Sequence, residues 1–157
     1  QIMNRLLHVI TRLLKKNHLT LSVCESCTGG MLASIITGVP GSSKYFVGGV
    51  ISYANEVKEK IVGVKKKTLK KYGAVSPETA KEMAKGVREK FASDIGLSIT
   101  GIAGPSGGTK KKPVGLVYIC AVDKKRVYVE RLLLKGSRTV IREKACLRAL
   151  YLLKEFL

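Results

Sequence analysis

Acidic residues are scarce in this sequence of 157 residues, which has 11 Asp and Glu against 29 Lys and Arg and a formal net charge of +18. Long hydrophobic runs are also missing. The longest stretch without a charged residue, 26–43, contains several glycines and a proline, which excludes a membrane span there. Arg5 and Arg12 interrupt the first apolar pattern too early for a secretory signal peptide.

The composition is otherwise that of a globular protein, with 45% hydrophobic and 25% charged residues. These values argue against a disordered or fibrous chain despite the high charge. The length fits one domain that buries enough apolar surface to fold without metals or disulfides. No internal repeat or interdomain linker is visible. We therefore expect residues 1–157 to form one domain.

The excess of positive charge raises the question of nucleic-acid binding, because clustered Lys and Arg neutralise phosphates. Lysines gather at 65–71, 110–112 and 124–125, but few aromatic residues lie between them and no nucleic-acid-binding motif is present. Lysine-rich faces exposed to solvent explain the charge equally simply. We expect no sequence-specific nucleic-acid complex, and a role as a basic nucleic-acid accessory protein is kept as an alternative.

Cysteine usage indicates reduced thiols and a cytoplasmic location, because the chain is large for a disulfide-stabilised secreted protein. Cys24 and Cys27 form a Cys-x-x-Cys pair, which by itself suggests zinc or redox chemistry. No second Cys-x-x-Cys or His pair completes a tetrahedral ligand set, so we predict no metal.

Helices and strands alternate along the sequence. The apolar spacing and the turn residues predict helices over 2–16, 31–36, 55–62, 76–91 and 137–156, and strands over 20–24, 46–53, 95–100, 114–122 and 126–134. Strands separated by helices run parallel, whereas the tight turn at 123–125 requires antiparallel pairing. The pattern predicts an α/β fold, with most strand C-termini at one edge of the sheet, where ligands usually bind. Four side chains should converge at this edge: Ser26, Tyr53, Thr100 and Arg138.

Ser26 is the candidate nucleophile, because it lies where the first strand gives way to a helix. Gly29 and Gly30 follow it, and they allow a ligand to approach free backbone N–H groups that can stabilise an oxyanion. The alternative is a serine or threonine that merely caps the helix before a glycine turn.

A serine nucleophile needs a base, and the two histidines, His8 and His18, lie in or after the first helix, away from this edge. A Ser-His-Asp triad is therefore not expected. Lys58 is the candidate base, because the first turn of a helix capped by Asn55 favours a neutral amine over an ammonium. Tyr53 lies just before that helix and is a candidate either to relay the proton or to hydrogen-bond the reacting group. The alternative is a surface lysine and a strand-end tyrosine.

Six segments resemble, in order, the motifs of one protein family, the C-terminal domain of the CinA proteins, which includes nicotinamide-nucleotide amidases. The segments are 25–30, 39–43, 53–58, 73–76, 100–105 and 112–115. The resemblance extends over nearly the whole chain. It implies a three-layer α/β/α sandwich with a mixed five-stranded sheet in which one strand is antiparallel.

The resemblance also implies a serine amidohydrolase that converts nicotinamide mononucleotide into nicotinate mononucleotide and ammonia without a cofactor. Its catalytic residues would be Ser26, Tyr53 and Lys58. For the substrate we expect the N–H groups near Thr28, Gly29 and Gly30, a pocket lined by Thr100 and Gly101, and a phosphate site at Arg138 and Arg142.

Three points stay open at this level. Arg138 and Arg142 are equally compatible with pairing to Glu143 or with exposure to solvent. The large N-terminal domain of full CinA proteins is not part of this sequence, so its activity is not expected here. A catalytically silent partner-binding domain of a longer CinA-like protein is an alternative. A homo-oligomer is compatible with the sequence.

Overall fold

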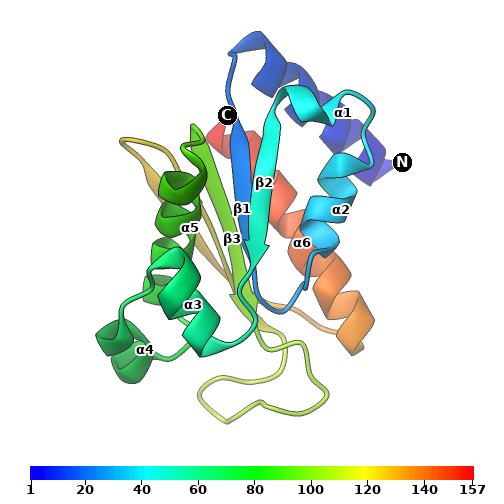
Figure 1. The fold of residues 1–157 in the computed structure, drawn as a ribbon. Coiled ribbons are helices and arrows are strands. Elements are labelled where there is room, and N and C mark those ends of the chain that lie inside the picture. Colours follow the sequence, from blue (N-terminus) through cyan, green and yellow to red (C-terminus); the bar gives the residue numbers. More distant parts are fainter.

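Five strands and six α-helices form the fold, in a computed structural model that describes residues 1–157 (Figure 1). The helices are α1 (Ile2–Lys16), α2 (Met31–Thr37), α3 (Asn55–Val62), α4 (Lys66–Tyr72), α5 (Pro77–Phe91) and α6 (Arg138–Phe156), with a 3-10 turn at Ser42–Lys44. The strands are β1 (Leu21–Glu25), β2 (Phe46–Ile51), β3 (Ile95–Gly101), β4 (Leu116–Val122) and β5 (Val127–Leu133).

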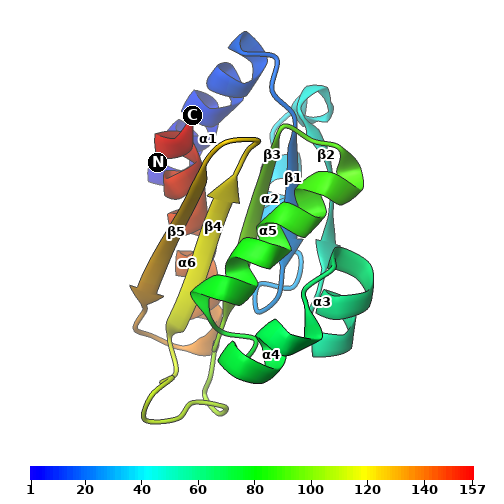
Figure 2. The ribbon, with the colours of Figure 1, turned by 90° about the vertical axis from the view of Figure 1, so that its left-hand side faces the viewer.

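The strands form one mixed sheet in the order β2-β1-β3-β4-β5. Strand β1 pairs in parallel with β2 and β3, and β4 is antiparallel to both of its neighbours. Helices α1, α2 and α6 cover one face, and α3, α4 and α5 cover the other (Figures 1 and 2). The three-layer α/β/α sandwich with one antiparallel strand is confirmed. The C-terminal ends of β1, β2 and β3 therefore lie at one edge of the sheet.

Helix α1 shows how the apolar pattern determines the packing. Leu6, Ile10 and Leu14 are spaced to lie on one face of the helix, and all three are buried in an apolar cluster that also contains residues of α6 and the sheet. A single cluster of 26 buried apolar residues fills this side of the sheet. Two smaller clusters lie on the other side, under α5.

Close packing on the α5 side fixes the helix that carries Lys58. A Cβ at Gly86 of α5 would lie 1.8 Å from the Val62 carbonyl oxygen at the end of α3. A Cβ at Gly96 of β3 would lie 2.2 Å from the Ala84 carbonyl oxygen of α5. Both contacts require glycine because no side chain fits between the backbones. Helices α3 and α5 and the sheet are thus held at short distances from one another.

The structure differs from the predicted elements at four places, one of which is the strand predicted over 114–122, which begins at Leu116. Helix α4 was not predicted, because its lysine-rich sequence lacks an apolar stripe and only Thr68 is buried. Helix α3 begins at Asn55, so Ala54 rather than Asn55 occupies the cap position. Strand β2 ends at Ile51, which leaves Tyr53 in the connection to α3 rather than in the strand. None of the helices is both long enough and apolar enough to cross a lipid bilayer.

Candidate active site

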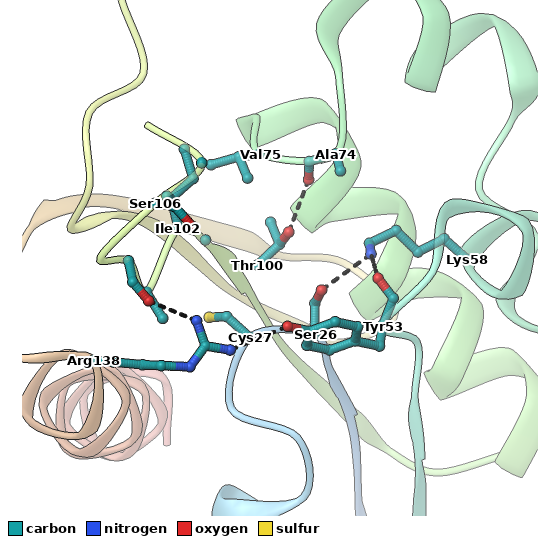
Figure 3. Close-up of a pocket in the computed structure, with 14 residues that line it drawn as sticks. Ser26, Cys27, Tyr53, Lys58, Ala74, Val75, Thr100, Ile102, Ser106 and Arg138 are labelled. Atoms are coloured by element: carbon teal, nitrogen blue, oxygen red, sulfur yellow. Dashed lines mark hydrogen bonds between the residues drawn. The ribbon is translucent and has the colours of Figure 1, made fainter. Parts of the chain in front are cut away.

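A cavity of about 340 Å³ opens at the C-terminal edge of β1 and β3. Its walls come from the loop after β1, the start of α3, the connection between α4 and α5, the glycine-rich loop after β3 and the start of α6 (Figure 3). The lining residues are Ser26, Cys27, Tyr53, Lys58, Ala74, Val75, Thr100, Gly101, Ile102, Ala103, Gly104, Ser106, Gly107 and Arg138. The predicted convergence of Ser26, Tyr53, Thr100 and Arg138 is confirmed, and Lys58 joins them.

Lys58 lies in the first turn of α3, and its side chain reaches back into the sheet edge, where only 1% of the residue is exposed. The Nζ atom lies 3.0 Å from the Ser26 Oγ (Figure 3). It donates hydrogen bonds to the carbonyl oxygens of Ser52 at 2.7 Å and Tyr53 at 3.0 Å. The lysine is therefore held against the serine by two backbone acceptors and is not a solvent-exposed surface lysine.

Burial lowers the pKa of Lys58 below its usual value, because the charged form loses its hydration. No carboxylate forms an ion pair with its ammonium. In the neutral amine, the two N–H groups serve the two carbonyls and the lone pair is left facing the Ser26 hydroxyl. This is the arrangement that a base needs in order to accept the serine proton.

The cysteines around this pair are thiols rather than thiolates. Burial raises the pKa of both Cys24 and Cys27 to about 11, and the Cys24 Sγ lies 3.2 Å from the Ser52 Oγ. All four cysteines are free and buried. No group of three or more Cys, His, Asp or Glu side chains in the chain is arranged to hold a metal ion. Cys24 and Cys27 therefore contribute packing near the site, and Cys27 also lines the cavity.

The loop after Ser26 corrects one sequence-based expectation. The N–H of Gly29 donates to the Ser26 carbonyl oxygen, and that of Gly30 donates to the Glu25 carboxylate. The Thr28 hydroxyl also donates to Glu25, at 2.6 Å. These three residues do not line the cavity. Gly29 and Gly30 both have positive φ and shape the loop. Their N–H groups donate hydrogen bonds within the loop, so these N–H groups are not free to bind an oxyanion.

The Tyr53 hydroxyl is not in a position to relay a proton between Ser26 and Lys58. Its carbonyl oxygen accepts a hydrogen bond from Lys58, but its hydroxyl accepts one from the Arg138 guanidinium at 3.2 Å. No hydrogen bond joins the hydroxyl to Ser26 or Lys58. The residue is 60% exposed, and Figure 3 shows its ring extending toward Arg138 at the mouth of the cavity. Tyr53 therefore connects the buried lysine to the cavity mouth.

The two arginines of α6 separate in the structure. Arg138 lines the cavity and donates to the Gly104 carbonyl oxygen at 2.6 Å. Arg142 lies one turn further along and donates to the carbonyl oxygens of Cys27 and Thr28, both at 3.0 Å. The two guanidinium groups do not form a shared phosphate site, because Arg142 donates to the loop after β1 and does not line the cavity. Neither arginine pairs with Glu143.

Thr100 and Gly101 form the floor of the cavity, as expected. The Thr100 hydroxyl donates to the Ala74 carbonyl oxygen at 2.8 Å and so ties β3 to the wall before α5. A Cβ at Gly101 would lie 2.6 Å from the Val117 side chain, so the glycine allows the close pairing of β3 and β4.

Glu25 is the residue that sequence reasoning missed. It is the last residue of β1 and only 1% exposed, and its carboxylate accepts from Thr28 and from the N–H groups of Gly30, Leu32 and Ala33. A carboxylate at the start of a helix is stabilised by these N–H groups and by the helix dipole. The available signal was a single acidic residue in an otherwise charge-free segment before a glycine turn.

A family model described as the CinA C-terminal domain matches residues 3–157. The chain belongs to this family. Among its relatives, a CinA-like protein of Kosmotoga olearia is 54% identical over 142 residues, which cover 90% of this chain and 34% of that protein. A CinA-like protein of Syntrophomonas wolfei is 51% identical over 152 residues, which cover 97% of this chain and 36% of that protein.

Solved structures of CinA proteins share the whole fold. A competence/damage inducible protein from Agrobacterium tumefaciens superposes with a TM-score of 0.94 at 35% identity, covering 98% of this chain and 94% of that chain. A CinA superfamily protein from Escherichia coli gives 0.95 at 32% identity, covering 100% and 91%. The chain spans about a third of the length of the two CinA-like relatives, whereas it matches nearly all of these two structures.

Proposed function

We propose that this CinA domain is a serine amidohydrolase that converts nicotinamide mononucleotide into nicotinate mononucleotide and ammonia. The observation that carries the proposal is the 3.0 Å separation between the buried Lys58 Nζ and the Ser26 Oγ at the floor of a cavity. A lysine held in this way is a suitable base for a serine nucleophile. The substrate is the one that resemblance to nicotinamide-nucleotide amidases implies.

The reaction begins when neutral Lys58 accepts the Ser26 proton and the Oγ attacks the carboxamide carbon. The carbonyl π electrons move to oxygen and form a tetrahedral oxyanion. As the C–N bond breaks, the Lys58 ammonium returns the proton to the departing amide nitrogen and ammonia leaves. A water molecule, deprotonated by Lys58, then hydrolyses the nicotinoyl ester and restores Ser26. These steps use protein groups and water and require no cofactor.

Arg138 supports the nucleotide part of the proposal. Its guanidinium lines the cavity mouth and is held there by the Gly104 carbonyl and the Tyr53 hydroxyl. A guanidinium in a fixed position suits a phosphate group, because its planar donors match the phosphate oxygens. The cavity floor then takes the pyridine carboxamide and the mouth takes the phosphate. Tyr53 positions both Lys58 and Arg138 in this assignment.

Ammonia release tests the proposal directly. Purified wild-type protein should release ammonia from nicotinamide mononucleotide in step with nicotinate mononucleotide formation, and Ser26→Ala should abolish both. Nicotinamide without the ribose phosphate should react poorly, since it cannot contact Arg138. Absence of ammonia release by folded wild-type protein, or equal turnover by Ser26→Ala, would contradict the assignment.

The pH dependence of turnover follows from Lys58. Only the neutral amine accepts a proton, so kcat should rise with pH through the pKa of Lys58 and fall as acid protonates the amine. Because burial lowers that pKa, the midpoint should lie below the value of about 10.4 that exposed lysines show. The measurement is kcat at saturating substrate across the pH range in which the protein stays folded. A midpoint at or above about 10.4 would exclude a desolvated lysine base.

A further inference from the structure

The glycine-rich loop, residues 102–115, connects β3 to β4 and forms one wall of the cavity. It extends beyond the edge of the sheet in both views of the fold (Figures 1 and 2). Only two hydrogen bonds join residues 103–112 to other parts of the chain. The first runs from the Arg138 guanidinium to the Gly104 carbonyl oxygen, near the start of the loop, and the second is donated by Lys112, near its end. This wall of the cavity therefore depends on few contacts.

Lys112 joins the loop to the end of α4. Its Nζ donates to the Tyr72 carbonyl oxygen at 2.5 Å, and its own backbone N–H and C=O are held by the hydroxyl and the N–H of Thr109. A cation is favoured at the C-terminus of a helix, because the last carbonyl groups have no partner within the helix. The neighbouring Lys110 and Lys111 are exposed and form no hydrogen bond or ion pair, whereas Lys112 is partly buried. The contact at Tyr72 thus sets Lys112 apart from the other lysines of the loop.

The opposite wall, which Lys112 contacts, is itself firmly held. Tyr72 is followed by Gly73, whose carbonyl oxygen accepts hydrogen bonds from the hydroxyl groups of Ser76 at 3.0 Å and Thr79 at 2.7 Å. A Cβ at Gly73, which has a φ of +80°, would lie 3.0 Å from the Lys112 Nζ, so the glycine leaves room for the ammonium group. The next two residues of the chain line the cavity. Lys112 therefore connects a loop with few contacts to a wall that is fixed on α5.

Two of the six segments that resemble family motifs, 73–76 and 112–115, meet at this hydrogen bond. Lys112 begins the second segment, and its acceptor, Tyr72, directly precedes the first. Neither segment supplies a reacting group to the proposed mechanism. A role in holding the two walls of the cavity at a fixed separation accounts for both.

We infer that Lys112 is a positioning residue, which fastens the loop to the end of α4 and so sets the width of the cavity and the size of the molecule that can reach Ser26. The inference rests on the proposed function for the identity of the substrate. Ser26 and Lys58 form no hydrogen bond with the loop, so the chemical step should not need Lys112. A loop that is free to move must instead be ordered when a substrate binds, and this cost weakens binding.

The test compares Lys112→Met, which keeps the length of the side chain but donates no hydrogen bond, with Lys112→Arg, which can still donate to the Tyr72 carbonyl oxygen. Lys111→Met is the matched control, because Lys111 lies in the same loop but is exposed and forms no hydrogen bond. Circular dichroism and thermal unfolding check the folding of each variant. Lys112→Gln, which is shorter and polar, replaces the Met variant if that variant does not fold. Hydrogen–deuterium exchange of residues 102–115 measures how firmly the loop is held.

Two further measurements report on the cavity itself. The first is kcat and KM for nicotinamide mononucleotide. The second is the ratio of the rates at which a bulky aryl fluorophosphonate and a small alkyl fluorophosphonate label Ser26. In labelling, the Ser26 Oγ forms a bond to phosphorus as the P–F bond breaks, fluoride leaves, and the serine proton passes to Lys58. A less stable fold would change both labelling rates alike, whereas a wider cavity raises the ratio of the bulky to the small probe.

We expect Lys112→Met to raise both KM and the labelling ratio by about tenfold, the effect of one lost hydrogen bond to a charged group, while kcat changes by less than about threefold. Hydrogen exchange in the loop should become faster in this variant. Lys112→Arg should restore most of each value, and Lys111→Met should behave as the wild type.

An unchanged KM and labelling ratio in folded Lys112→Met or Lys112→Gln would overturn the inference. An equal fall of both labelling rates would overturn it too, because a purely structural role predicts that result, as would the same changes in Lys111→Met. If wild-type protein is labelled but releases no ammonia from nicotinamide mononucleotide, the proposed substrate is wrong and the labelling ratio alone decides the role of Lys112. If wild-type protein is neither labelled nor active, the proposed function and the inference both fail.

Discussion

Lys58→Arg is expected to reduce amidase turnover by roughly 10²–10⁴-fold, the contribution of a general base, while the protein remains folded. Arginine can still donate to the Ser52 and Tyr53 carbonyls, but its guanidinium is always charged and does not lose a proton in proteins. The Ser26 hydroxyl would then have no group to accept its proton. The measurement is kcat for ammonia release from nicotinamide mononucleotide.

A second variant separates loss of the base from crowding by the larger side chain. Lys58→Met matches the length of lysine, removes the charge and provides no base, so it should be as inactive as the arginine variant. Lys60→Arg on the same helix is the control for the substitution itself and should keep wild-type activity, because Lys60 is exposed. Substantial turnover by folded Lys58→Arg or Lys58→Met would reject a serine–lysine mechanism.

The sequence alone was sufficient for the fold and for the convergence of the site. Alternating helices and strands predict parallel β1, β2 and β3, and their C-terminal ends bring Ser26 and Thr100 to one edge. Lys58 could be predicted as the candidate base because the local sequence places it in the first turn of a helix. Regular periodicity carries this information, since it determines which face of each element is buried.

The hydrogen bonds of the site could not be predicted from the periodicity of the sequence. The sequence places Arg138 and Arg142 on one face of α6, yet the first lines the cavity and the second binds the Cys27 and Thr28 carbonyls. That difference depends on the angle between α6 and the loop after β1, which results from tertiary packing. The Tyr53 hydroxyl likewise bonds Arg138 rather than Ser26 or Lys58, and Tyr53 lies in the connection after β2 rather than in the strand.

The hydrogen bonds within the loop after β1 also could not be predicted from the local sequence. Two glycines after a serine indicate an open turn with free N–H groups, whereas the buried Glu25 carboxylate binds the Gly30 N–H and the Ser26 carbonyl binds that of Gly29. A carboxylate that points along the chain into the following helix satisfies donors that would otherwise be available. Which amides are left over can be decided only when every acceptor in the loop is placed.

Ser26→Ala and Lys58→Arg are expected to be non-additive. Each single variant should lose nearly all turnover, and the double variant should be little slower than either one, because residues that act as a unit fail together when one is removed. The physical reason is the 3.0 Å contact between the two atoms: the lysine lone pair serves the reaction only through the Ser26 proton. Once the hydroxyl is gone, the base at position 58 has no proton to accept.

The measurement is a double-mutant cycle on kcat/KM for nicotinamide mononucleotide, with Ser26→Ala/Lys60→Arg as the comparison pair. Lys60 has no contact with Ser26, so that pair should simply show the Ser26→Ala effect. The Ser26 and Lys58 effects should instead show a coupling nearly as large as either single loss. Losses that multiply in the Ser26→Ala/Lys58→Arg variant would mean that the two residues contribute independently. Lys58 would then act on the fold or on substrate binding rather than on the serine proton.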